Sequence, residues 1–185
     1  MVDRQLAILA QNVLAALAIR GQRIVCAESC TAGMIAATLA AVPGASRHFC
    51  GSQVVYRNDT KILWLGVPPA ILDDPTRGAV CLETAQWMAN GVLAKTPEAD
   101  VALSITGHLG PGAPRGLDGV AVLGWAIRTA TGLESRSQHR LLTSSPPDET
   151  TPLALQMERR LKRQQEAVAM ALLFVLQQLE ATSTS

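Results

Sequence analysis

The chain has 185 residues, of which 48% are hydrophobic and 17% are charged, so its composition excludes a disordered protein and suffices for one buried core. Sixteen lysine and arginine residues against fifteen acidic residues leave a net charge of +1. This balance argues against a nucleic-acid-binding surface and favours a small molecule or another protein as the partner.

The four cysteines form neither a CxxC pair nor a Cys/His cluster, so we expect no zinc site and no disulfide framework. Two apolar stretches raise the question of a signal peptide or a membrane segment. The first, Leu6 to Ile19, follows Asp3 and is interrupted by Gln11 and Asn12, which does not fit a signal peptide. The second, Ala167 to Leu176, has ten residues, about half of what a bilayer requires. We therefore expect a soluble, cytoplasmic protein.

The first quarter of the chain predicts a helix, a strand and a second helix. Apolar residues from Leu6 to Leu17 recur at helical spacing, and Asp3 is placed to cap this helix. The run Ile24 to Ala27 is typical of a short buried strand. A polar turn, Glu28 to Gly33, then leads into an alanine-rich helix that continues through Ala41.

The middle of the chain predicts two more strands and two more helices. Asn58 or Asp59 is expected to cap the first of these helices, and apolar residues line one side of the second. The expected strands cover Phe49 to Tyr56 and Val101 to Thr106, and the expected helices cover Thr60 to Leu65 and Leu82 to Lys95.

The last part of the chain predicts a hairpin and a long helix. Two strands, Val120 to Thr129 and Leu133 to Leu142, flank the turn signal Thr131-Gly132. A linker, Thr143 to Pro152, precedes the helix. The apolar face of this helix is expected to consist of Leu161, Val168, Leu172, Val175 and Leu179.

Single strands that alternate with helices predict parallel strand pairing, and the late hairpin adds an antiparallel member. The expected fold class is therefore α/β: a three-layer α/β/α sandwich with a mixed, mostly parallel sheet of about five strands. We expect one domain over residues 1–185.

In such sheets, ligands bind at the carboxyl ends of the strands, where loops and helix N-termini converge. Three segments follow the first three strands and are expected to meet there: Glu28 to Gly33, Tyr56 to Lys61 and Thr106 to Gly112. The third segment is rich enough in glycine for backbone amides to approach a ligand closely, although an ordinary surface loop has the same composition. It has neither the Walker A ending nor the GxGxxG spacing.

The first two segments together suggest a serine nucleophile with an amine base. Ser29 needs a group that takes its proton, and Lys61 can do so if burial lowers its pKa. Tyr56, the single tyrosine, is placed to relay the proton or to orient the amine. Taken separately, the residues have simpler interpretations: Ser29 or Thr31 caps the helix, Tyr56 packs, and Lys61 is solvated.

Two other residue types compete for these roles. Cys30 is a rival nucleophile, because a helix start would lower the pKa of its thiol. Among the histidines, His48 and His139 lie outside the three segments and are expected at the surface, whereas His108 lies within the third segment.

Several motifs in order resemble the CinA C-terminal domain family, which includes stand-alone nicotinamide mononucleotide deamidases. The resemblance covers nearly the whole chain, from the first helix to the last. Its motifs are Ala27-Glu28-Ser29-Cys30-Thr31-Ala32-Gly33, Val42-Pro43-Gly44-Ala45-Ser46, Tyr56-Arg57-Asn58-Asp59-Thr60-Lys61 with Leu65-Gly66-Val67, Gly78-Ala79-Val80, and Thr106-Gly107 with Gly110-Pro111-Gly112.

The resemblance implies an α/β/α fold, a dimer, and hydrolysis of the carboxamide of nicotinamide mononucleotide to nicotinate mononucleotide and ammonia, with no metal and no cofactor. It assigns catalysis to Ser29 as the nucleophile, with Tyr56 and Lys61 as its activating partners. The residues it implies for substrate binding are Glu28, Cys30, Thr31, Gly33, Asn58, Thr106, Gly107, Gly110 and Gly112.

The chain departs from the family pattern around these residues. Ala32 stands where the family usually has glycine, Arg77 where it has histidine, and His108-Leu109 where it has an Ile-Ala pair. The segment Arg115 to Gly119 replaces a Lys-Pro-Val-Gly stretch on a slightly shorter loop. The altered loop leaves open an alternative function, a non-catalytic relative that binds a nucleotide or a partner protein through the same cleft.

Overall fold

The computed structural model describes residues 3–114, 116–146 and 150–181. Arg115 and residues 147–149 of the expected linker therefore lie outside the described residues. The helices are α1 (Arg4–Arg20), α2 (Met34–Ala40), α3 (Asn58–Leu65), α4 (Pro69–Leu72), α5 (Leu82–Ala94) and α6 (Leu153–Ala181), with a 3-10 turn at Ala45–Arg47. The strands are β1 (Ile24–Glu28), β2 (Phe49–Val54), β3 (Val101–Gly107), β4 (Val120–Thr129) and β5 (Gly132–Leu141).

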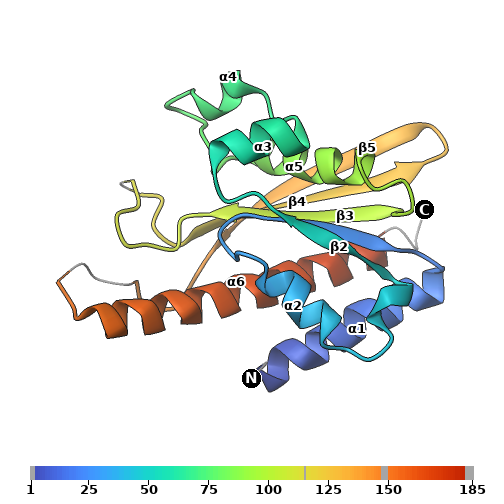
Figure 1. Cartoon of the computed structure of the whole chain (residues 1–185), viewed down its shortest axis with the longest axis horizontal. Coiled ribbons are helices and arrows are strands. Elements are labelled where there is room, and N and C mark those ends of the chain that lie inside the picture. Colours follow the sequence, from blue (N-terminus) through green and yellow to red (C-terminus); the bar gives the residue numbers. More distant parts are fainter. Residues whose placement is uncertain (1–2, 115, 147–149, 182–185) are drawn as a thin grey trace.

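The five strands form one mixed sheet in the order β2-β1-β3-β4-β5. Strand β1 pairs in parallel with β2 and β3, whereas β4 is antiparallel to both of its neighbours. Figure 1 shows α1, α2 and α6 on one face of the sheet and α3, α4 and α5 on the other. The predicted three-layer α/β/α sandwich with a mixed sheet is confirmed.

Alternating residues of the central strands divide the core into two layers. On β1, Cys26 packs among side chains of α1 and α6, and its neighbours Val25 and Ala27 pack against α5. Because side chains alternate between the faces of a strand, a continuously apolar strand is the pattern of a sheet covered on both sides. The carboxyl ends of β1, β2 and β3 consequently meet at one edge, with a helical layer above and below.

Three details of the sequence prediction are wrong. Strand β2 ends at Val54, two residues before the expected end at Tyr56. Helix α3 begins at Asn58, two residues earlier than expected, and the residue before it, Arg57, makes no side-chain cap. Asn58 and Asp59 are thus inside the helix rather than capping it. Leu161, which was expected on the apolar face of the last helix, is 45% exposed. The reason is that only the later turns of α6, from Ala167 on, pack against the hydrophobic core.

None of the helices in the described part of the chain combines the length and the apolarity needed to cross a bilayer.

Candidate active site

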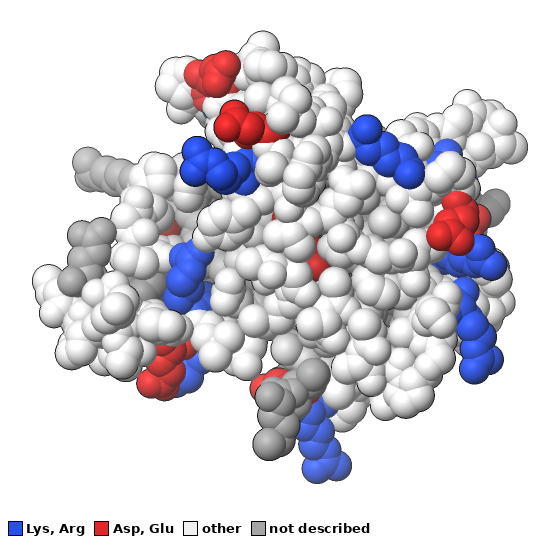
Figure 2. Space-filling view, viewed as in Figure 1, with Lys and Arg blue, Asp and Glu red and all other residues white. Residues whose placement is uncertain are grey.

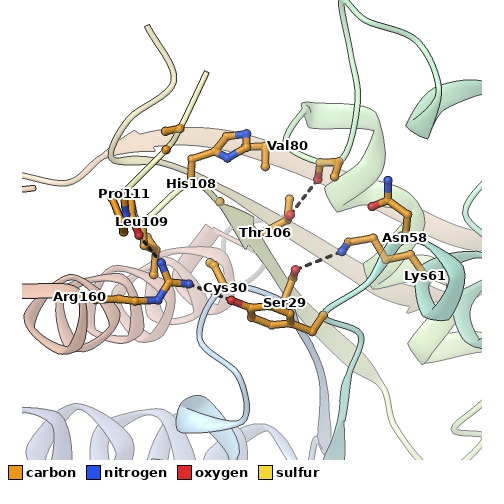
Figure 3. Close-up of a pocket in the computed structure, with 16 residues that line it drawn as sticks. Ser29, Cys30, Asn58, Lys61, Val80, Thr106, His108, Leu109, Pro111 and Arg160 are labelled. Atoms are coloured by element: carbon orange, nitrogen blue, oxygen red, sulfur yellow. Dashed lines mark hydrogen bonds between the residues drawn. The ribbon is translucent and has the colours of Figure 1, made fainter. Parts of the chain in front are cut away.

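A cavity of about 230 Å³ opens at the carboxyl ends of β1 and β3 (Figure 3). All three segments expected at this edge contribute to it, together with Ala79 and Val80 before α5, Ala113, and Arg160 of α6. A cavity near the lower end of the usual range for ligand sites suits a small molecule. Its walls are formed by Ser29, Cys30, Tyr56, Asn58, Lys61, Ala79, Val80, Thr106, Gly107, His108, Leu109, Gly110, Pro111, Gly112, Ala113 and Arg160.

Ser29 is the first residue after β1, and its backbone N–H still donates to the carbonyl of Ile105 on β3 (3.0 Å). Its side chain is 7% exposed and lines the cavity. The sheet therefore fixes the backbone of Ser29, while its hydroxyl remains accessible from the cavity.

Glu28 holds the turn that carries Ser29. Its buried carboxylate accepts hydrogen bonds from the hydroxyls of Thr31 (2.8 Å) and Ser52 (3.0 Å). It also accepts three backbone N–H bonds at the start of α2, from Gly33, Ile35 and Ala36 (2.9–3.0 Å). Glu28 thus caps α2, a role that the simpler interpretation of the sequence gave to Ser29 or Thr31.

Lys61, one turn into α3, is 2% exposed and points its amine at Ser29. Its Nζ lies 3.1 Å from Oγ of Ser29 and 2.9 Å from the carbonyl oxygen of Val55. Burial disfavours the charged ammonium and lowers the pKa of Lys61 to about 8. One of the dashed lines in Figure 3 marks the contact between Ser29 and Lys61, the only serine and the only lysine among the described residues of the cavity wall.

Tyr56 lines the cavity but is 54% exposed. Its hydroxyl accepts a hydrogen bond from Nη2 of Arg160 (2.9 Å). Among the described residues, Tyr56 is therefore joined to α6, and the expected contact with the amine of Lys61 is not found.

Arg160 is the cavity residue that the sequence analysis missed. It lies on α6, 104 positions after Tyr56, and also donates a hydrogen bond to the carbonyl of Gly110. A signal was present in the sequence, because the buried face formed by Ala167, Val168 and Ala171 continues backwards at helical spacing through Arg163 and Arg160. Charged residues on a core-facing stripe indicate a polar partner inside the fold.

The glycine-rich segment after β3 forms the remaining wall. Thr106 points its hydroxyl at the carbonyl of Ala79 (2.8 Å), which fixes the loop before α5. A Cβ on Gly107 would lie 2.8 Å from the carbonyl oxygen of Val120 and 3.2 Å from Sγ of Cys30, so only glycine fits there. Gly110 and Gly112 both line the cavity.

Cys30 lines the cavity, but the lowered thiol pKa expected from its place at a helix start is not found. Its thiol is buried, and desolvation raises its pKa to about 12, with smaller opposing effects from nearby cations. A helix start lowers a thiol pKa only where the thiolate is solvated or paired. The thiol of Cys30 therefore stays protonated at neutral pH, while Lys61 beside it approaches the neutral form.

Three residues expected at the binding site lie outside the cavity wall: Glu28, Thr31 and Gly33. The physical reason is that Thr31 and the N–H of Gly33 bond to the carboxylate of Glu28, which turns this segment towards α2. Ala32 has a left-handed backbone (φ 52°) and an exposed side chain, so this departure from the family pattern does not touch the cavity.

The cavity is cationic. The described residues of its wall include Lys61 and Arg160 but no aspartate or glutamate. A negatively charged ligand would find two basic groups here and no acidic group to repel it. Among the described residues, no group of three or more His, Cys, Asp and Glu side chains is placed to hold a metal ion.

Fold and site together define an α/β/α protein with a serine and a buried lysine paired at the carboxyl ends of its parallel strands. The family model of the CinA C-terminal domain matches residues 6–146. The chain therefore belongs to the CinA C-terminal domain family, and the family resemblance drawn from its motifs is confirmed.

Relatives of known sequence and structure agree. The chain is 46% identical over 104 residues to a CinA-like protein of Desulfotalea psychrophila, covering 56% of this chain and 24% of that protein. It is 41% identical over 131 residues to a CinA-like protein of Myxococcus xanthus, covering 71% and 30%. The chain thus spans less than a third of the length of these two curated relatives.

Solved structures match nearly end to end. The competence damage-inducible protein A of Klebsiella pneumoniae superposes with a TM-score of 0.80 at 25% identity, covering 95% of this chain and 97% of that one. The competence/damage inducible protein CihA of Agrobacterium tumefaciens superposes with a TM-score of 0.74 at 29% identity, covering 95% and 96%.

Proposed function

We propose that this protein is a metal-independent amidohydrolase that converts nicotinamide mononucleotide to nicotinate mononucleotide and ammonia. The observation that carries the proposal is the amine of Lys61, buried, with its pKa lowered to about 8 and 3.1 Å from the hydroxyl of Ser29. A serine hydroxyl becomes a nucleophile when a neighbouring base takes its proton, and a lysine can be that base only when it is neutral.

In the proposed reaction, the neutral amine keeps one N–H on the carbonyl of Val55 and turns its lone pair towards Ser29. As Oγ attacks the carboxamide carbon, Nζ takes the hydroxyl proton. The C–N bond of the tetrahedral intermediate then breaks, and the departing nitrogen takes that proton from Nζ and leaves as ammonia. Water hydrolyses the acyl ester through the same amine, which restores Ser29 and releases the carboxylate.

Recognition of the substrate draws on the charge of the cavity. A mononucleotide carries a phosphate, and Arg160 offers a fixed cation at the end of the cavity away from Lys61 (Figure 3). Its bonds to Tyr56 and Gly110 leave further guanidinium N–H groups for an anion. Tyr56 serves in this scheme by orienting Arg160.

Ammonia release from nicotinamide mononucleotide, measured on the purified protein without added metal, tests the proposal. We expect turnover, and we expect Ser29→Ala to lower it by about a hundredfold or more, because the nucleophile is lost. Ser46→Ala is the matched control, since Ser46 is exposed and lies outside the cavity wall. Unchanged ammonia release in Ser29→Ala contradicts the mechanism. Nucleotide binding without turnover of any pyridine nucleotide supports the non-catalytic alternative.

A further inference from the structure

His108 is a polar side chain of the cavity wall that the proposed mechanism does not use. It directly follows β3, and its backbone makes two hydrogen bonds at the start of β4. Its N–H donates to the carbonyl of Val120, and its carbonyl accepts from the N–H of Gly119 (2.8 Å each). These two bonds fix the backbone of His108 just beyond the end of β3.

The side chain of His108 shares a cavity with two residues already described. Thr106, two residues earlier, lines this cavity and bonds to the carbonyl of Ala79 in the loop before α5. Lys61 lines the same cavity. In Figure 3 the ring of His108 stands near Val80, above the level of Ser29, with Arg160 entering from one side of the view and Lys61 from the other.

The imidazole has no hydrogen-bonding partner among the described residues, although His108 is half-buried. Burial lowers the pKa of His108, and the carboxylate of Asp118 opposes this effect only weakly. Asp118 is bound by both terminal nitrogens of Arg163 (2.7 and 2.8 Å), so its charge is already compensated. Two basic side chains, Arg160 and Lys61, line the same cavity. His108 therefore presents one free donor and one free acceptor at neutral pH.

A neutral donor–acceptor pair between a reacting end and a cationic end matches the middle of a nucleotide. In a bound mononucleotide with its amide at Ser29 and its phosphate at Arg160, the part between them is the ribose. A sugar hydroxyl both donates and accepts a hydrogen bond, as neutral imidazole does, whereas a phosphate would be better served by a charged group.

We propose that His108 is a specificity-determining residue that hydrogen-bonds a ribose hydroxyl of the substrate, so that the site selects a ribonucleotide amide over its deoxy analogues. The inference rests on the proposed function, because it takes the substrate to be a mononucleotide with an amide.

Calorimetric binding to the inactive Ser29→Ala protein tests this assignment without depending on turnover. The probes are nicotinamide mononucleotide and its 2′-deoxy and 3′-deoxy analogues, measured at pH 8. We expect the ribonucleotide to bind about fivefold to tenfold more tightly than at least one deoxy analogue, the difference that one hydrogen bond makes. Adding His108→Leu should remove this preference, so that the affinities become equal.

Two further variants separate recognition from folding. His108→Gln keeps a donor and an acceptor and should retain part of the preference, whereas His139→Leu, on the exposed outer strand β5, should leave the preference at its full value.

The same preference in His108→Leu as in its parent would overturn the assignment. Failure of the parent to bind any of the three nucleotides would overturn it together with the proposed function. Binding with an intact His108-dependent preference, but without ammonia release by the native protein, would contradict the proposed function alone.

Discussion

At the scale of single residues, the site depends on a lysine that is buried without a carboxylate partner. Lys61 makes hydrogen bonds to Val55 and Ser29, and the cavity wall holds no acidic group that would stabilise its ammonium form. A surface lysine has a pKa near 10.4 and would be almost fully protonated at neutral pH. The environment of Lys61 is what turns an ordinary cation into a base.

The pH dependence of the reaction should report this residue. Because Lys61 acts in its neutral form and its pKa is lowered to about 8, kcat/KM is expected to rise with pH through about 8 and then level off. The rise follows deprotonation of the free enzyme. Steady-state ammonia release between pH 6 and 10 measures it. Lys61→Arg should be inactive throughout, because a guanidinium stays protonated. A flat profile across this range would contradict the role of Lys61 as the base.

The same lowered pKa has a consequence for stability. Below about pH 8 the folded protein holds a charged, desolvated amine, whereas the unfolded chain solvates it. Between about 8 and the ordinary lysine value, the unfolded chain binds more protons than the folded one, so the contribution of Lys61 to stability becomes less unfavourable as pH rises. The burial that makes Lys61 a base therefore also lowers the stability of the fold at neutral pH.

At the scale of elements, α6 organises the site and contributes Arg160 to its wall. Three of its residues within little more than one turn hold two segments, the loop between β3 and β4 and the turn after β1. Arg160 binds the carbonyl of Gly110, Arg163 binds Asp118, and Gln164 binds the carbonyl of Cys30 (3.1 Å). Figure 1 shows the loop after β3 above the first half of this helix. A single rigid element thus sets the distance between the nucleophile turn and the glycine-rich wall.

These contacts explain what the sequence could and could not predict. The periodicity of apolar residues predicted the strands and helices. The rule that sites form at the carboxyl ends of strands then placed Ser29, Lys61 and Gly107 at one edge of the sheet. Both steps use only the local pattern of the sequence. The contact of Arg160 with Tyr56 joins residues 104 positions apart, and no local pattern encodes such a pairing. The capping role of Glu28 was also hidden, since it requires a carboxylate at a strand end to turn back onto the next helix.

The packing of α3 against α5 gives a prediction at this scale. A Cβ on Gly91 of α5 would lie 2.0 Å from the carbonyl oxygen of Leu65, the last residue of α3, which also carries Lys61. Gly91→Ala should therefore push α3 away, destabilise the fold by about 2–3 kcal/mol, and lower the activity that depends on Lys61. Chemical unfolding and ammonia release measure the two effects.

Gly21→Ala provides the control for Gly91→Ala. Gly21 has a left-handed backbone (φ 62°) but no neighbour within 4 Å of a Cβ. Its replacement should cost about 1–2 kcal/mol from backbone strain alone and leave the rate per folded molecule unchanged. Equal stability of Gly91→Ala and the native protein would show that the helices can separate without loss.

At the scale of the whole molecule, the charge of the cavity differs from that of the complete chain. The cavity has two cations and no acid in its wall, whereas the complete chain is nearly neutral, at +1. On the face shown in Figure 2, lysine and arginine side chains stand apart from one another, several of them beside acidic groups. A local cationic cavity suits one phosphate of a small ligand, but a nucleic acid requires a row of basic groups along its backbone.

The protein is therefore expected not to bind duplex DNA at about 0.15 M salt. Nonspecific affinity for DNA arises from the release of counterions by several basic side chains acting together, and it falls steeply with salt. Fluorescence anisotropy of a labelled duplex, titrated with protein at low and at physiological salt, measures both the affinity and its slope. Any weak association at low salt should vanish as ions screen the separated charges. Binding of the duplex at physiological salt, with an affinity that depends steeply on salt concentration, would require a basic surface of several residues. Such a result would contradict the conclusion that the basic groups of this protein serve a small anionic ligand rather than a nucleic acid.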